Sequence, residues 1–307
     1  MQSKMVSIGM ATYNGEKFLS EQLDSIFNQT FTNFELIICD DNSTDNTIEI
    51  IKRYSKQYTN IKLYQNSKRL GFVKNFEKVI SLSQGDYIAL SDQDDIWYRD
   101  KLKISIENLE KLDINQPTLF HSDLEVINDK KELISKSFFK MRSYRFPKDK
   151  AIDIMVGRCG VMGNSIVFNQ ALKSIILPFP KDLQVHDYWI ALVNELFGKR
   201  ITYYLPLLKY RIHSYNISNS IEKLNQPKKL NSNIRLPFHN INRERVLLEL
   251  LDRYRLSLDD KEILNSFLDY LLFNRRKIYF LYLIFRYRCQ KSSKLNIFTL
   301  SFSKFIL

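Results

Sequence analysis

The acidic segment at residues 91–95 is the part of this sequence best suited to chemistry. It reads Ser-Asp-Gln-Asp-Asp and places Asp92, Asp94 and Asp95 directly after an apolar run at 87–90. Carboxylates gathered at the end of a buried strand repel one another, and their charge is costly there unless a cation lies among them. Such oxygen ligands suit Mg²⁺ or Mn²⁺ holding a phosphorylated ligand. A metal site and a solvated acidic turn are both compatible with these residues alone.

The elements that would position this segment follow from the pattern of apolar residues. Four apolar runs alternate with helically spaced stripes over about the first 90 residues, the runs being 5–11, 34–39, 61–64 and 87–90. This alternation predicts βαβ units and a mainly parallel sheet flanked by helices, which is an α/β fold. Such sheets bind ligands beyond the carboxyl ends of their strands. The polar clusters 12–15 and 40–45 also follow apolar runs, so we expect them to converge with the acidic segment.

The pattern after residue 112 is less regular. We expect a strand near 118–121, a loop-rich stretch at 128–150, a helix that begins near His186, and a strand near 203–210. Helical stripes return at 246–271. No internal repeat and no low-complexity tract is present.

Composition narrows the class of protein. The 307 residues carry a net charge of +12, to which residues 225–307 contribute 16 basic against 7 acidic side chains. The first 224 residues are therefore close to charge balance, which argues against a nucleic-acid-binding core. Three widely spaced cysteines indicate neither a disulfide framework nor a zinc site and fit a reducing, cytoplasmic setting. We see no leader at the N-terminus, and the apolar run 278–285 is far shorter than the roughly 18 to 20 residues that span a bilayer.

Several enzyme classes fit poorly. No G-x-G-x-x-G follows the first apolar run and no P-loop occurs anywhere, so a dinucleotide oxidoreductase and a P-loop NTPase are disfavoured. A nucleotidyltransferase stays open as an alternative, although the segment 14–17 supplies little of the glycine-rich basic loop expected there. A membrane- or nucleic-acid-binding protein with a degenerate catalytic half is the other alternative, and the intact acidic residues argue against it.

The ordered motifs resemble those of the family 2 glycosyltransferases, most of all the bacterial rhamnosyltransferase-like branch that builds surface polysaccharides. The similar segments extend over about residues 5–216, and they are 11–15, 40–45, 91–97, 121–123, 186–189 and 210–213. The resemblance implies a GT-A nucleotide-sugar-binding fold with a C-terminal helical extension. It also implies an inverting, metal-dependent transfer that uses Mn²⁺ or Mg²⁺.

The same resemblance implies a role for individual residues. Those expected to bind the nucleotide sugar are Thr12, Tyr13, Asn14, Asp40, Asp41, Asp92, Asn164 and Arg211. Those expected to hold the metal are Asp92, Asp94, Asp95 and His213. Trp97 is expected to pack in the core, and Asp45 to cap a helix.

On the acceptor side, the resemblance makes Asp187 the general base that deprotonates the attacking hydroxyl. His186 is an alternative base or an orienting partner, and a helix N-cap is the competing interpretation of Asp187. His121, Ser122 and Asp123 are weaker candidates for contact with the acceptor.

The expected function is transfer of one sugar, with dTDP-rhamnose as a candidate donor, to a lipid-linked polysaccharide or oligosaccharide. The domains expected are a GT-A domain at 1–224, with a nucleotide-binding half at 1–115 and an acceptor half at 116–224, and a basic helical region at 225–307. That region could lie on an anionic membrane surface, which would make the protein peripheral on the inner face of the cell membrane. Alternatively, it is a helical subdomain that packs its apolar stripes.

Overall fold

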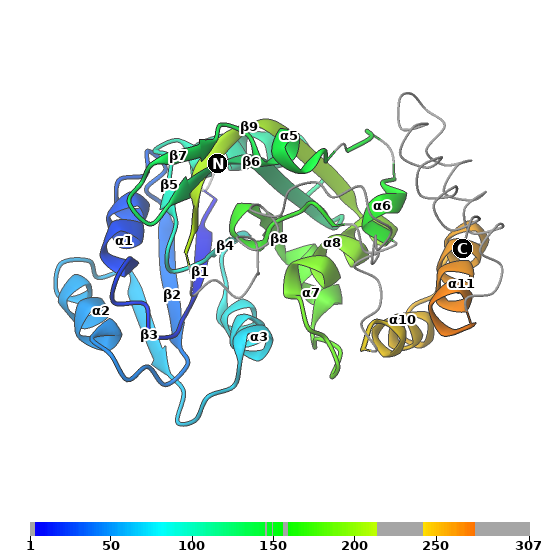
Figure 1. Cartoon of the computed structure of the whole chain (residues 1–307), viewed down its shortest axis with the longest axis horizontal. Coiled ribbons are helices and arrows are strands. Elements are labelled where there is room, and N and C mark those ends of the chain that lie inside the picture. Colours follow the sequence, from blue (N-terminus) through cyan, green and yellow to red (C-terminus); the bar gives the residue numbers. More distant parts are fainter. Residues whose placement is uncertain (1–3, 145, 149, 156–158, 214–241, 274–307) are drawn as a thin grey trace, which may run out of the picture. The chain divides into compact units, whose positions relative to one another are not determined.

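The computed structural model describes residues 4–273 with gaps at 145, 149, 156–158 and 214–241 (Figure 1). The chain divides into two compact units. The first comprises Met1–Phe146, Gly160–Phe179 and Val185–Asn225, and the second comprises Pro147–Cys159, Pro180–Gln184 and Gln226–Leu307. Each unit is described by itself.

The N-terminal half of the first unit is the alternating α/β arrangement that the sequence predicts. Its strands are β1 (Val6–Thr12), β2 (Phe34–Asp40), β3 (Ile61–Gln65) and β4 (Tyr87–Ser91). Its helices are α1 (Leu19–Phe27), α2 (Thr47–Ser55) and α3 (Phe72–Leu82). The four strands pair in parallel in the order β3-β2-β1-β4, so their carboxyl ends lie at one edge. The predicted mainly parallel sheet is confirmed here.

Helix α3 shows why this half folds as the apolar pattern predicts. Phe76, Val79 and Ile80 recur at helical spacing and are buried, and α3 packs on β1 and β2. Strand residues such as Ile8 and Ile88 are fully buried, as expected for a parallel sheet with layers on both faces.

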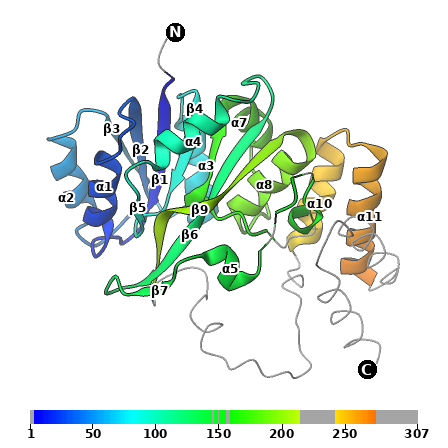
Figure 2. The ribbon, with the colours of Figure 1, turned by 90° about the horizontal axis from the view of Figure 1, so that it is seen from above.

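The sheet continues with strands of both directions. These are β5 (Ile96–Trp97), β6 (Thr118–Asn128), β7 (Leu133–Ser135), β8 (Val167–Asn169) and β9 (Lys199–Ile212). Strand β8 is antiparallel to β4 and β6, whereas β6 and β9 run parallel side by side (Figure 2). Strand β6 extends beyond the expected 118–121, and its pairing with β9 continues on both sides of register shifts at Ser122/Asp123 and Asp123/Glu125.

The remaining helices of the first unit surround this part of the sheet. They are α4 (Lys101–Leu109), α5 (Phe138–Arg142), the short 3₁₀ helix η1 (Gly163–Ser165), α7 (Gln170–Ile176) and α8 (His186–Phe197). Helix α8 begins at the predicted residue and ends before Gly198. Trp189 of α8 is fully buried and its indole N–H donates to the carbonyl of Ile176 at 2.9 Å.

The second unit contains α6 (Ile152–Met155), α10 (Asn242–Arg253) and α11 (Leu258–Phe273). Leu250 and Leu264 are fully buried, and Lys150 pairs with Asp260 at 2.6 Å. Within the part of the chain that the structure describes, no helix combines the length and apolar character needed to cross a membrane. The basic aromatic stretch at 275–288 lies outside the described residues.

Candidate functional site

The polar clusters that follow β1, β2 and β4 meet at the carboxyl edge of the sheet. The Thr12 hydroxyl donates to the Asp40 carboxylate at 2.9 Å. The Gln93 side chain bonds both backbone groups of Tyr13, at 2.9 Å to its N–H and 3.0 Å to its carbonyl. The convergence expected from the strand order is therefore confirmed.

The adjacent carboxylates after β2 are both held by protein groups. Asp40 also accepts from the backbone N–H of Ser43 at 2.9 Å. Asp41 accepts from the backbone N–H groups of Leu70 at 2.6 Å and Gly71 at 2.8 Å. Gly71 has φ +86°, a backbone conformation that residues other than glycine rarely adopt. Glycine therefore suits the turn that directs these amides toward Asp41. The two acids thus shape the loops around the predicted nucleotide pocket.

The Tyr13 ring contacts the side chain of Arg69, a residue that the sequence motifs did not indicate. The guanidinium of Arg69 lies 3.9 Å from the centre of the Tyr13 ring. Arg69 belongs to the loop between β3 and α3, which leaves the same edge of the sheet. The neighbouring Asn14 has φ +46° and its side chain accepts from the backbone N–H of Thr44 at 2.9 Å. Only the position of that loop after a predicted strand could have indicated Arg69.

Asp92, Asp94 and Asp95 form one cluster, with a carboxylate oxygen of each within 4.8 Å of the others. Asp95 is fully buried, and the other two are half-buried. Burial, followed by repulsion from neighbouring carboxylates, raises the pKa of both Asp92 and Asp95. A divalent cation would remove that repulsion, so this all-oxygen donor set fits Mg²⁺ or Mn²⁺.

Hydrogen bonds join the acidic cluster to β9 and to η1. Asp95 accepts from the backbone N–H of Arg211 at 3.1 Å and from the side-chain amide of Asn164 at 2.6 Å. The His213 Nε2 atom lies 2.9 Å from an Asp94 oxygen. The structure therefore brings His213, Asn164 and Arg211 to the acidic segment, although each is distant from it in sequence.

Arg211 contacts protein groups throughout its length. Its side chain is fully buried; Nε donates to the Asp94 carbonyl at 2.8 Å and Nη2 pairs with Glu21 at 2.6 Å. Its guanidinium also lies 4.5 Å from the Phe18 ring centre. These contacts fix the backbone of the acidic segment, while the nucleotide contact that the resemblance implies stays a prediction. Glu21 was not indicated by any motif.

Asp187 occupies the second position of α8, after Val185 in the N-cap position, so it is not the cap itself. Its carboxylate accepts from the backbone N–H of Gly163 at 3.2 Å. Burial raises the pKa of Asp187 to about 6, an effect opposed by the N–H groups of Tyr188 and Gly163. A carboxylate with such a pKa suits a general base near neutral pH.

His186 is a weaker candidate for that role. Its ring stacks on Phe76 at 4.1 Å between centroids and meets Phe72 edge-on at 5.0 Å. Burial lowers the pKa of His186 to about 3, so the neutral imidazole is a poor proton acceptor. The ring also packs on Gly163, where an added Cβ would lie 2.8 Å from Nε2. These contacts favour Asp187 as the base.

The acceptor candidates on β6 have internal partners. Asp123 accepts from the N–H of Phe139 at 2.9 Å and from the Ser137 hydroxyl, and it thereby holds the start of α5. His121 is fully buried with Nε2 2.8 Å from the Thr202 hydroxyl, and Ser122 is buried as well. These positions indicate a structural role.

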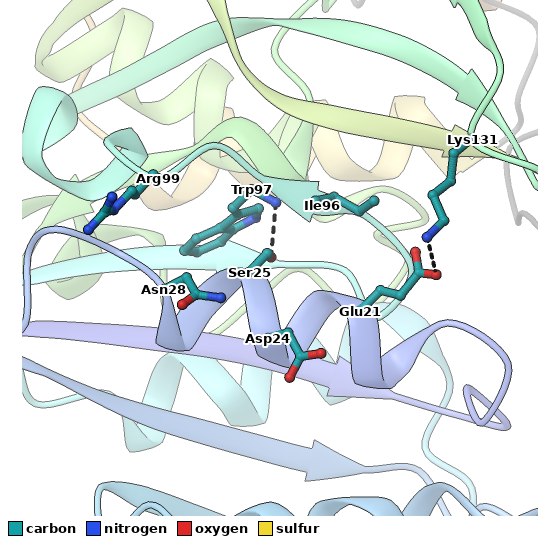
Figure 3. Close-up of a pocket in the computed structure, with 8 residues that line it drawn as sticks. All are labelled: Glu21, Asp24, Ser25, Asn28, Ile96, Trp97, Arg99 and Lys131. Carbon is teal, nitrogen blue, oxygen red and sulfur yellow. Dashed lines mark hydrogen bonds and ion pairs between the residues drawn. The ribbon is translucent and has the colours of Figure 1, made fainter.

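A separate groove of about 620 Å³ lies between α1 and the segment around β5 (Figure 3). Its lining residues are Glu21, Asp24, Ser25, Asn28, Ile96, Trp97, Arg99 and Lys131. Trp97 is 3% exposed and its backbone N–H donates to the Ser25 hydroxyl at 3.0 Å, so it packs in the core as expected. None of the residues predicted to bind the nucleotide, the metal or the acceptor lines this groove.

The α/β sheet gathers an acidic cluster at the carboxyl edge of its parallel strands, and α8 carries a separate buried carboxylate. Residues 7–175 match the model of the family described as glycosyl transferase family 2, which covers more than half of the chain. The chain belongs to this family, as the resemblance predicted, and it is a glycosyltransferase.

Two curated relatives illustrate the family. The chain is 27% identical over 223 residues to the UDP-Glc:alpha-D-GlcNAc-diphosphoundecaprenol beta-1,3-glucosyltransferase WfgD of Escherichia coli, covering 72% of this chain and 82% of WfgD. It is 46% identical over 105 residues to the dTDP-rhamnosyl transferase RfbG of Shigella flexneri, covering 33% of this chain and 36% of RfbG.

Two solved structures share the fold. Residues 1–349 of TarS from Staphylococcus aureus align with a TM-score of 0.61 at 18% identity, covering 90% of this chain and 73% of that chain. The mannosyltransferase PcManGT of Pyrobaculum calidifontis, in complex with GDP-Man and Mn²⁺, aligns with a TM-score of 0.54 at 16% identity, covering 99% of this chain and 80% of that chain. The predicted GT-A fold is confirmed.

Proposed function

We propose that this glycosyltransferase catalyses an inverting, metal-dependent transfer of a sugar to a lipid-linked polysaccharide or oligosaccharide precursor. One observation carries the proposal: the carboxylates suited to a cation, at the end of β4, are distinct from the carboxylate suited to a base, on α8. The two sites still interact electrostatically, because the negative charge of Asp187 contributes to the raised pKa of Asp92.

The cation site in this proposal is built from Asp92, Asp94 and Asp95, with His213 beside Asp94. Mn²⁺ or Mg²⁺ bound there would neutralise negative charge that develops on the departing nucleoside diphosphate. Asp92 would serve both the metal and the donor. Support comes from the oxygen donor set, and from PcManGT, a protein of similar fold that was solved in complex with Mn²⁺.

The donor in this proposal is a nucleotide sugar, with dTDP-rhamnose as the candidate to test first, as suggested by the name of RfbG. The pocket for its nucleotide part would be lined by the turns after β1 and β2, which carry Thr12, Tyr13, Asn14, Asp40 and Asp41. An aromatic ring and several hydroxyl and amide groups there suit a base and a ribose.

The base in this proposal is Asp187. An inverting transfer needs one group that removes the acceptor hydroxyl proton while the oxygen attacks the anomeric carbon opposite the leaving group. The Asp187 carboxylate has one oxygen bonded to the Gly163 N–H, which orients it. Asn164 and Arg211 would support the same site through Asp95.

The direct test compares Asp94→Ala and Asp187→Asn with Asp113→Asn, which removes an exposed carboxylate outside the site. We expect the first two variants to fold and to lose at least about 100-fold in transfer rate, whereas the third retains the wild-type rate. Wild-type rates in either of the first two would overturn the assignment. Release of a nucleoside diphosphate, and not of pyrophosphate, separates this reaction from that of a nucleotidyltransferase.

The acceptor in this proposal is carried by a lipid, as the name of WfgD suggests for that relative. The basic residues of the stretch 275–288 would hold the enzyme against an anionic membrane surface on the cytoplasmic side. Removing residues 274–307 should therefore lower sedimentation with phosphatidylglycerol vesicles, most clearly at low salt. Equal partition of both proteins would show that the segment does not bind the membrane.

A further inference from the structure

The short helix η1 touches both of the carboxylates to which separate tasks have been assigned. The N–H of Gly163 donates to Asp187 at 3.2 Å. The side-chain amide of the next residue, Asn164, donates to Asp95 at 2.6 Å. Adjacent residues of one turn therefore bind the proposed base and the proposed cation cluster.

The turn has little freedom to let one of these bonds move without the other. Gly163 packs on His186 so closely that a Cβ would lie 2.8 Å from the ring nitrogen. The backbone N–H of Ser165 donates to the Met162 carbonyl at 2.9 Å and closes the turn without using the Ser165 side chain. The carbonyl of Ile166 accepts from the N–H of Leu90, at 3.1 Å, in the strand that leads into the acidic segment.

The Asn164 side chain is buried and is oriented by its hydrogen bond to Asp95. It is 2% exposed, and its NH₂ group faces a carboxylate, which fixes the orientation of the amide. Its carbonyl oxygen has no hydrogen-bond partner among the described residues. Burying an amide group costs free energy unless hydrogen bonds compensate for its lost hydration. The bond to Asp95 supplies that compensation for the Asn164 amide.

We propose that Asn164 is a positioning residue that couples cation binding at the acidic cluster to the placement of the Asp187 carboxylate. A cation that draws the three carboxylates together would order Asp95, hence Asn164, and hence the Gly163 N–H that orients Asp187. The inference rests on the proposed function, and it describes a coupling between two sites through one shared element.

The test uses Mn²⁺ alone, without sugar or acceptor, and follows hydrogen exchange of a peptide that covers residues 162–168. Wild-type protein is compared with Asn164→Ala and with Ser165→Ala, a control in the same turn that leaves the Asp95 bond intact. We expect Mn²⁺ to slow exchange in wild type and Ser165→Ala, and to have little effect in Asn164→Ala. Mn²⁺ affinity, measured by titration calorimetry, should weaken about tenfold in Asn164→Ala, as expected for loss of a hydrogen bond to a charged group.

A second variant guards against misfolding. Asn164→Asp keeps the shape of the side chain but places a like charge against Asp95, so it should lose the Mn²⁺-dependent protection while its circular dichroism stays native. Equal protection by Mn²⁺ in wild type and both Asn164 variants would overturn the coupling and leave the proposed metal site standing. Absence of Mn²⁺ binding to the wild-type protein would overturn the metal site and the coupling together.

Discussion

Asp92, Asp94 and Asp187 carry the same functional group in different surroundings. Burial and the carboxylates of Asp94 and Asp187 together raise the pKa of Asp92, and a divalent ion would relieve that strain. Burial raises the pKa of Asp187 to about 6, and hydrogen bonds from backbone N–H groups oppose the rise. The first environment suits cation binding, and the second suits proton transfer.

This difference predicts a pH dependence for the transfer reaction. Asp187 must be ionised to accept a proton, and protonation removes that form, so kcat/KM should be constant above its pKa and should fall tenfold per pH unit below about pH 6. The measurement is a pH–rate profile at saturating Mn²⁺. The residual activity of Asp187→Asn should lack this acidic limb. An identical limb in that variant would assign the titration to another group.

The sequence predicts which residues belong to the candidate site better than it predicts which of them bond to one another. The motif positions after β1, β2 and β4 meet as expected, because strand order alone brings them together. The partners Asn164 and Asp95 are 69 positions apart, and Arg211 and Glu21 are 190 apart. No local pattern encodes such pairs, since they depend on how β9 and η1 pack beside the acidic segment.

Some helices and strands can be predicted from the sequence much more clearly than others. Helices α1 to α3 follow from apolar periodicity because each buries one continuous face, and strands β1, β2 and β4 follow from continuous apolar runs that are buried along nearly their whole length. Helix α5 falls in a stretch expected to be loop-rich, since it is short and depends on capping by Ser137, whose hydroxyl accepts from the N–H of Lys140 at 3.1 Å. The register shifts between β6 and β9 likewise have no signature in one sequence.

Strand β9 is fastened to α1 and to the acidic segment by Arg211, so this connection should be important for stability. Arg211→Gln removes the ion pair with Glu21 and a bond to the Asp94 carbonyl, and it should lower the free energy of unfolding by about 2–4 kcal/mol. Chemical denaturation measures the change. Arg245→Gln, which removes the exposed pair with Asp182, should cost less than about 0.5 kcal/mol. Equal losses in the two variants would contradict a special role for Arg211.

The whole molecule offers a test that needs no knowledge of the acceptor. A ligand that binds the folded protein alone raises its stability by mass action, by about 2.7 kcal/mol at 100 times Kd. In a protein of this size, that corresponds to a rise in Tm of about 4 °C. We expect such a shift with Mn²⁺ and the matching nucleoside diphosphate from a panel of UDP, GDP and dTDP. Asp94→Ala should abolish it, and a panel without any shift would argue against this donor class.

The way Asp41 holds the loop at 66–71 has a consequence for how this enzyme can diversify. The carboxylate accepts from the backbone N–H groups of Leu70 and Gly71 and from the side-chain amide of Asn66, so the bonds need a glycine at 71 and an asparagine at 66. The side chains at 67–70 are exposed and do not supply these bonds. Substitutions there can accumulate without unfolding the scaffold, so under the proposed function this loop is where a library of variants could be searched for a changed choice of nucleotide.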